Sequence, residues 1–145
     1  MILTHSIEIQ APRERVFAHL SDPDKVKQWA QGTEERIYLT PEPHGVGTRF
    51  KQRIREGRQV NEYDGEILAY EPSSHLRVRM TRGSTAMTLD CRLSGSSSGV
   101  THLDQSLTAV FGGLFIRAVA RLFSPFIRQL MRKQANALKE LAEKP

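Results

Sequence analysis

Hydrophobic and polar residues alternate at the start of the chain. One face of this segment carries Leu3, His5, Ile7 and Ile9, and the residues between them are polar. A period of two is typical of a strand that is buried on one face only. The pattern therefore predicts a half-buried β-strand over residues 3–10.

The spacing of apolar residues then changes to a helical period. After Pro12, which suits the first turn of a helix, Val16, Phe17 and Leu20 form one apolar stripe. We expect a short helix that ends at residues 21–23. A second short helix follows over residues 22–30, with Trp29 as its largest apolar side chain.

From residue 35 to residue 109 the pattern predicts antiparallel strands separated by turns. A two-residue hairpin loop at residues 56–57 would pair Phe50 with Tyr63, and one at residues 83–84 would pair Met80 with Met87. Both hairpins place charged residues on one face of the sheet and apolar or amide residues on the other.

The last hairpin has two possible registers. A five-residue loop over residues 95–99 pairs Leu93 with Thr101 and keeps the leucines inside, whereas a four-residue loop turns His102 and Asp104 inward. We prefer the five-residue loop. The inner face of the predicted sheet then carries six polar residues: His5, Gln52, Asn61, Tyr63, Arg82 and Gln105. Buried polar groups need partners, so this number favours a wet or ligand-filled space over a dry core.

The segment from residue 113 to residue 143 predicts one long amphipathic helix. Its charged stripe contains Arg117, Arg121, Arg128, Arg132 and Lys139. The opposite face contains Phe115, Val119, Leu122, Phe123, Phe126, Ile127, Leu130, Leu138 and Leu141. Charges interrupt every window long enough to cross a bilayer, which excludes a transmembrane helix. Pro125 is expected to bend the helix, and the apolar face is expected to lie against the sheet with the arginines toward water.

Composition limits the class of protein. A chain of 145 residues with 39% hydrophobic and 26% charged residues predicts one globular domain over residues 1–145. The single cysteine, Cys91, excludes an intrachain disulfide and favours a cytoplasmic location. The net charge of +5 is spread along the chain without aromatic interleaving, so nucleic-acid binding is not expected.

Few residues are suited to catalysis. The predicted registers turn the strand carboxylates outward and leave Tyr63, Arg82 and His5 as the titratable candidates on the inner face. The five histidines are scattered and no CxxC pair exists, so neither a metal site nor a cofactor is predicted.

The stretch IEIQAPRERVFAHLSDPDKVKQW, together with the order of the predicted elements, resembles the START-like superfamily. This superfamily includes the birch-pollen-allergen-like proteins and the polyketide cyclase/dehydrase and lipid transport group. The matching residues are Ile7, Ile9, Ala11, Pro12, Val16, Phe17, Leu20, Asp22 and Trp29. The resemblance implies an α+β helix-grip fold: a curved seven-stranded antiparallel sheet, in the order 1-7-6-5-4-3-2, wraps around a long C-terminal helix, with two short helices after the first strand.

The resemblance also implies a cavity between sheet and helix that binds a lipidic, quinone-like or aromatic molecule. Residues expected to line it are Phe50, Gln52, Asn61, Tyr63, Val78, Met80, Met87, Leu89, Leu103, Gln105, Phe115, Val119, Phe123 and Phe126. Binding or transport of such a ligand is the leading hypothesis. The alternatives are a cyclase or dehydratase that uses Tyr63, Arg82 or His5, and an interaction module. In the latter, Arg117, Arg121 and Arg128 would meet an acidic protein or an anionic membrane.

Overall fold

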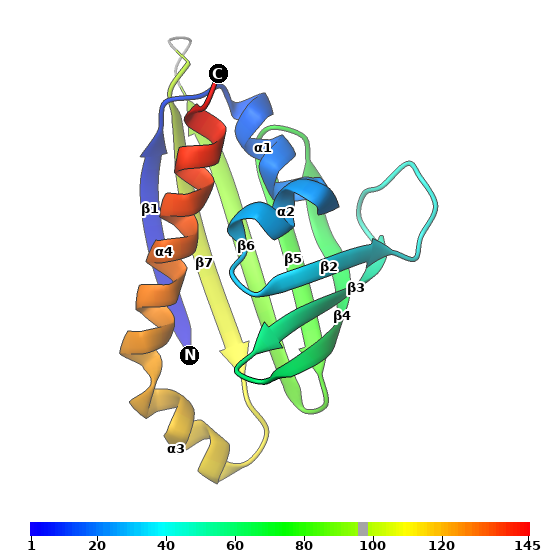
Figure 1. Ribbon diagram of the computed structural model, residues 1–145, viewed down its shortest axis with the longest axis vertical. Helices are drawn as coiled ribbons and strands as arrows, with labels where there is room; N and C mark the ends of the chain where they lie inside the picture. Colours follow the sequence, from blue (N-terminus) through cyan, green and yellow to red (C-terminus); the bar gives the residue numbers. More distant parts are fainter. Residues whose placement is uncertain (96–98) are drawn as a thin grey trace.

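The computed structural model describes residues 1–95 and 99–145, and these residues form seven strands and four helices (Figure 1). Strand β1 (Ile2–Ile9) is followed by helices α1 (Arg13–Ser21) and α2 (Pro23–Trp29). The chain continues through β2 (Thr33–Tyr38), β3 (Arg49–Glu56), β4 (Gln59–Glu71), β5 (His75–Arg82), β6 (Thr85–Gly95) and β7 (Thr101–Val110). It ends with α3 (Leu114–Leu122) and α4 (Ser124–Glu143).

The seven strands form one antiparallel sheet in the order β1-β7-β6-β5-β4-β3-β2. Figure 1 shows α4 lying along one face of this sheet on the side of β1, with α1 and α2 next to its C-terminal end. The predicted helix-grip fold is confirmed.

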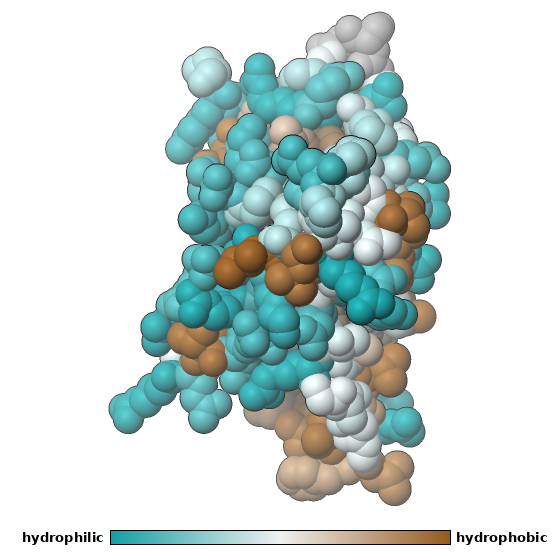
Figure 2. All heavy atoms as spheres, turned by 90° about the vertical axis from the view of Figure 1, so that its right-hand side faces the viewer, coloured by the Kyte–Doolittle hydropathy of each residue, from teal (hydrophilic) through white to brown (hydrophobic). Residues whose placement is uncertain are grey.

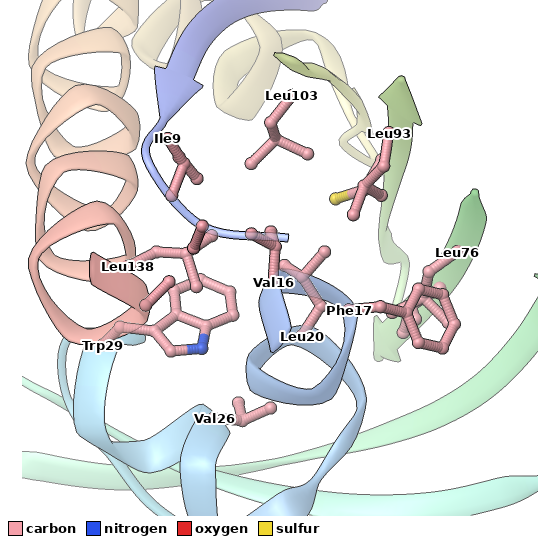
Figure 3. Packing of buried hydrophobic residues seen from close by; sticks show 14 of the residues in the cluster. Ile9, Val16, Phe17, Leu20, Val26, Trp29, Leu76, Leu93, Leu103 and Leu138 are labelled. Carbon is pink, nitrogen blue, oxygen red and sulfur yellow. The ribbon is translucent and has the colours of Figure 1, made fainter. Parts of the chain in front are cut away.

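The core lies where α1, α2 and α4 meet the inner face of the sheet (Figure 3). Three residues of this core are fully buried, at 0% exposure: Val16 of α1, Leu103 of β7 and Leu138 of α4. Trp29 of α2 belongs to the same cluster. The Trp29 indole Nε1 donates a hydrogen bond of 2.7 Å to the carbonyl of His19, so its polar atom is satisfied inside the cluster. This packing fixes the C-terminal half of α4 against the sheet.

The hairpin loops explain which strand registers were predicted correctly. The β5–β6 pairing of Met80 with Met87 is confirmed. In the β3–β4 hairpin, Phe50 pairs with Gly65 and Gln52 with Tyr63, so the predicted register is wrong by two residues. The two-residue loop begins at Gly57, which has a φ of 65°, instead of ending there.

The β6–β7 register differs from the prediction in the same way. Leu93 pairs with Leu103 instead of Thr101, and Gly95 pairs with Thr101. The predicted loop includes residues 96–98, which lie outside the described residues. A shift of two residues preserves which side chains share a face. The inner and outer faces of the sheet are therefore as predicted, although the partners across two hairpins are not.

The C-terminal segment is two helices and not one bent helix. α3 ends at Leu122 and α4 begins at Ser124, with Pro125 in the first turn of α4. Proline lacks the N–H that would continue the ladder of a single helix, and it fits the start of a new one. The Ser124 hydroxyl donates to the carbonyl of Arg121 at 3.0 Å, which satisfies one of the groups freed by the break. As a result α3 turns away from the core and packs mainly against α4.

Candidate functional site

A cleft of about 500 Å³ lies between the C-terminal helices and the ends of β1 and β7. We call it the arginine cleft. Its lining residues are Met1, Ile2, Leu3, Ala109, Val110, Phe111, Arg117, Ala120, Arg121, Ser124 and Arg128. Its volume is within the range of pockets that hold small organic ligands.

The floor of the arginine cleft is apolar and comes from the sheet. Leu3 of β1 and Ala109 of β7 are both buried on the inner face. The amino group of Met1 donates to the carbonyl of Ala109 at 3.1 Å, and the amide of Ala109 donates to the carbonyl of Met1 at 2.9 Å. These bonds hold Met1 beside β7.

The wall of the cleft is cationic because of helical spacing. In α3, Arg117, Ala120 and Arg121 are spaced by three and four residues, which places them on one side of the helix. In α4, Ser124 and Arg128 are spaced by four residues and line the same cleft. No Asp or Glu occurs between Gln105 and Lys139 in the sequence. Within residues 1–95 and 99–145, no carboxylate pairs with the three arginines of the cleft. The cleft therefore offers several guanidinium groups to an anion.

The fourteen residues predicted to line a cavity are not among those that line this cleft. Six of them are buried in the inner face of the sheet: Phe50, Gln52, Tyr63, Val78, Leu103 and Gln105. Five are half-buried: Asn61, Met80, Met87, Leu89 and Val119. Their contact with a ligand stays a prediction.

The last three of the fourteen do not lie on an inner wall. Phe115, Phe123 and Phe126 are 81%, 58% and 65% exposed, so the expectation that they face the sheet is wrong. Arg117, Arg121 and Arg128 are exposed, as expected, and they also line the cleft. The break before Ser124 explains the exposed phenylalanines, since it frees α3 from the direction that α4 takes along the sheet.

Polar residues on the inner face are largely satisfied by the protein itself. Gln52 accepts a hydrogen bond of 2.7 Å from Arg36 Nε and donates one of 3.1 Å to Thr33 Oγ1. The guanidinium carbon of Arg36 lies 4.4 Å from the centre of the Phe50 ring. The Gln52 amide is therefore already used in positioning β2 against β3.

Tyr63 is hydrogen-bonded to a carboxylate that the sequence reasoning missed. Its hydroxyl donates to Glu56 Oε1 at 2.7 Å, and burial together with this bond raises the pKa of Tyr63 to about 12. Glu56 was assigned to the hairpin loop, but the alternation of Phe50, Gln52 and Ile54 continues to it and would have placed it on the inner face. Arg82, the second catalytic candidate, is exposed.

His5, the third catalytic candidate, has an unused polar atom. Its Nε2 is buried and has no hydrogen-bond partner within the described parts of the chain. His5 pairs with Gln105 across β1 and β7 and lies two residues from Leu3 on the same face of β1. The side-chain amide of Gln105 donates to the Cys91 sulfur at 3.7 Å. A polar position thus lies just beyond the apolar floor of the arginine cleft.

The described residues contain neither a candidate metal site nor a helix that could span a membrane. Among the described residues, no group of three or more His, Cys, Asp or Glu side chains is arranged to hold a metal ion. No helix in the same residues combines the length and hydrophobicity required to cross a membrane.

The fold and the cleft define a helix-grip domain with a hollow between its last helices and its sheet. The model of a family described as "Polyketide cyclase / dehydrase and lipid transport" matches residues 2–143. The chain belongs to this family.

Curated relatives share part of the sequence. Uncharacterised proteins of Mycobacterium tuberculosis and Mycobacterium bovis are 29% identical over 84 residues, which is 58% of this chain. The match spans about half of the length of these relatives, 48%.

Solved structures share the fold over nearly the whole chain. The protein CV1439 from Chromobacterium violaceum has a TM-score of 0.77 at 19% identity, covering 100% of this chain and 99% of its own. The Zhui aromatase/cyclase from a Streptomyces species has a TM-score of 0.78 at 14% identity, covering 99% of this chain and 93% of its own. At these identities the likeness establishes the fold alone.

Proposed function

We propose that the protein binds a small hydrophobic molecule that carries an acidic group, and that the arginine cleft is the binding site. The observation that supports this proposal is a cleft of about 500 Å³ in which an apolar floor meets three arginines without carboxylate partners among the described residues. Membership of a family that includes lipid transport agrees with a hydrophobic ligand.

The apolar floor and the cationic wall of the cleft would bind different parts of the ligand. The apolar body of the ligand would contact Leu3, Ala109 and Phe111, which removes it from water. Its carboxylate or phosphate would accept charge-assisted hydrogen bonds from Arg121 and Arg128. A long ligand would extend along β1 to His5 Nε2, which has no hydrogen-bond partner among the described residues. We also propose a cytoplasmic location, because the single cysteine of the sequence, Cys91, is free and buried.

A cyclase or dehydratase reaction has less support. The Tyr63 hydroxyl donates to Glu56 and its pKa is raised to about 12, which makes it a weak acid at neutral pH. We therefore propose binding or transport in preference to catalysis.

The first test is to measure binding of laurate and of dodecanol, which share an apolar chain and differ in the acidic group. Arg121→Gln/Arg128→Gln should weaken laurate binding by about tenfold or more and leave dodecanol binding unchanged. Arg132→Gln/Lys133→Gln is the matched control, because both residues are exposed on α4 and neither lines the cleft.

Native mass spectrometry of freshly purified protein extends the test to ligands retained from the cell. An acidic lipidic or aromatic molecule should be released on denaturation and should be reduced in the Arg121→Gln/Arg128→Gln variant. Equal binding of laurate and dodecanol, or loss of laurate binding in the control variant, would refute the role of the arginines. Absence of binding to every hydrophobic probe would refute the proposal as a whole.

A further inference from the structure

Helix α3, at the lower end of the ribbon in Figure 1, and the start of α4 expose a cluster of large hydrophobic side chains. We call this surface the apolar cap. It consists of Leu114 (83% exposed), Phe115 (81%), Ile116 (46%), Leu122 (78%), Phe123 (58%) and Phe126 (65%). Figure 2 shows hydrophobic atoms gathered at the lower end of the molecule, the end at which α3 lies in Figure 1. An exposed cluster of this size is unusual and marks an interaction surface.

Helical geometry separates the apolar cap from the arginine cleft. At about 100° per residue, Phe115 and Leu122 project on the side of α3 opposite to Arg117 and Ala120, which line the cleft. The six side chains are between 46% and 83% exposed, so no described element covers the cap. A partner outside the domain is needed to remove these side chains from water.

Charge identifies the kind of partner. The stretch from residue 105 to residue 139 contains no acid and six basic residues: Arg117, Arg121, Arg128, Arg132, Lys133 and Lys139. A second copy of the chain docked on the same surface would bring these like charges together, which disfavours a dimer. A surface that is apolar in its interior and negative at its boundary fits both features. The interface of an anionic lipid bilayer has this composition.

We propose that the apolar cap docks onto membranes that contain anionic lipids. α3 lies in the plane of the interface, with Phe115, Leu122 and Phe126 among the acyl chains. The long side chains of the neighbouring arginines reach lipid phosphates. Docking brings the arginine cleft, on the other side of the same helix, next to the bilayer. This inference concerns the surface of α3 and does not depend on the proposed ligand.

The experiment is vesicle co-sedimentation with ligand-free protein. We expect binding to vesicles that contain phosphatidylglycerol, weak binding to vesicles of phosphatidylcholine alone, and a loss of binding at high ionic strength. Phe115→Ser/Phe123→Ser should reduce binding by about tenfold or more, because it removes two aromatic anchors. Arg117→Gln/Arg121→Gln/Arg128→Gln should reduce it by roughly 100-fold, at about fivefold per arginine near the surface.

Matched controls separate the cap from general hydrophobicity and charge. Leu39→Ser/Val46→Ser changes two exposed apolar residues outside α3 and α4, and it should leave vesicle binding unchanged. Circular dichroism of each variant shows that the fold is retained. Binding that is equal on neutral and anionic vesicles, or equally reduced by the control, would overturn the proposal.

Tryptophan fluorescence measures how deeply the apolar cap enters the bilayer. In the Phe123→Trp/Trp29→Phe variant, the only tryptophan is on the cap. Its emission should shift to the blue on anionic vesicles and be quenched by lipids brominated in the acyl chain. Sedimentation velocity without vesicles tests whether a second copy of the chain covers the apolar cap instead. A dimer that is lost in Phe115→Ser/Phe123→Ser would show that a second copy covers the cap and would overturn the membrane assignment.

Discussion

The hydroxyl of Tyr63 donates a hydrogen bond of 2.7 Å to Oε1 of Glu56. Asn61 Nδ2 donates to the same oxygen, also at 2.7 Å. One carboxylate oxygen therefore joins three residues at the end of the β3–β4 hairpin. Because the phenol is partly buried and bonded to a carboxylate, the pKa of Tyr63 is raised to about 12 from an ordinary value of 10.0.

This arrangement predicts a pH-dependent contribution to stability. The folded state holds the Tyr63 proton more tightly than the unfolded state, so the contribution is fully present below pH 10.0 and is lost as the pH rises toward about 12. The difference in the free energy of unfolding between wild type and Tyr63→Phe should shrink over this range, as measured by urea denaturation. In Glu56→Gln, absorbance of the phenolate should show Tyr63 ionising at lower pH. A difference that stays constant with pH would contradict the assignment.

Gly65 has to be glycine because of the Phe50 ring. A Cβ at Gly65 would lie 2.2 Å from Cε2 and Cζ of Phe50, whose side chain is 1% exposed and has no space to retreat. Gly65→Ala should therefore destabilise the protein by about 1–3 kcal/mol in chemical denaturation. Gly45→Ala is the control, because nothing lies within 4 Å of the added Cβ. The double variant Gly65→Ala/Phe50→Leu should recover part of the loss, and strict additivity of the two changes would argue against this contact.

His5 places a buried polar atom near the cleft and lowers the free energy of unfolding. Its Nε2 is buried without a partner in the described residues, and such a group is costly to desolvate. His5→Leu should raise the free energy of unfolding by about 1 kcal/mol and should weaken binding of a long acidic ligand. His102→Leu, which changes a histidine paired with Asp104 at 3.3 Å, should give no gain in stability. A stability decrease in His5→Leu would show that Nε2 has a protein partner.

The two C-terminal helices should respond differently to the same substitution. Leu138 of α4 is 0% exposed in the core, so Leu138→Ala should cost about 2–5 kcal/mol. Leu122 of α3 is 78% exposed, so Leu122→Ala should change stability by less than about 0.5 kcal/mol. Thermal or urea unfolding measures both. A similar loss from the two variants would mean that α3 is packed against the domain in solution.

The fold was predictable because alternation determines which face of a strand is buried, and this pattern survives an error in register. Both two-residue hairpin loops begin with glycine, Gly57 and Gly83, and each has a positive φ. The second loop was placed correctly and the first was not, because sequence alone does not show which loop position requires a positive φ. Because the first loop was placed one residue too early, Glu56 was not recognised as the hydrogen-bond partner of Tyr63.

The site was harder to predict than the fold. A helical stripe shows that a segment has an apolar side and a charged side, but it does not show which side meets the protein. In α4 the apolar side meets the core, as Leu138 shows. In α3 the apolar side is exposed and the arginines line the cleft, because the break before Ser124 removes the constraint that a continuous helix would impose. The cleft therefore contains arginines that were assigned to an outer surface.

The pairing of β1 with β7 determines when the sheet can be completed during synthesis. Ile2 pairs with Thr108 and Ile9 with Thr101, so β1 cannot pair until β7 has been synthesised. Strands β2 to β6 form hairpins with their neighbours in sequence as they emerge, whereas β1 needs contacts across nearly a hundred residues. Until then the apolar side of Ile7 and Ile9 has no strand beside it and is exposed to other chains. The step most open to misfolding is therefore the closure of the sheet edge next to the arginine cleft.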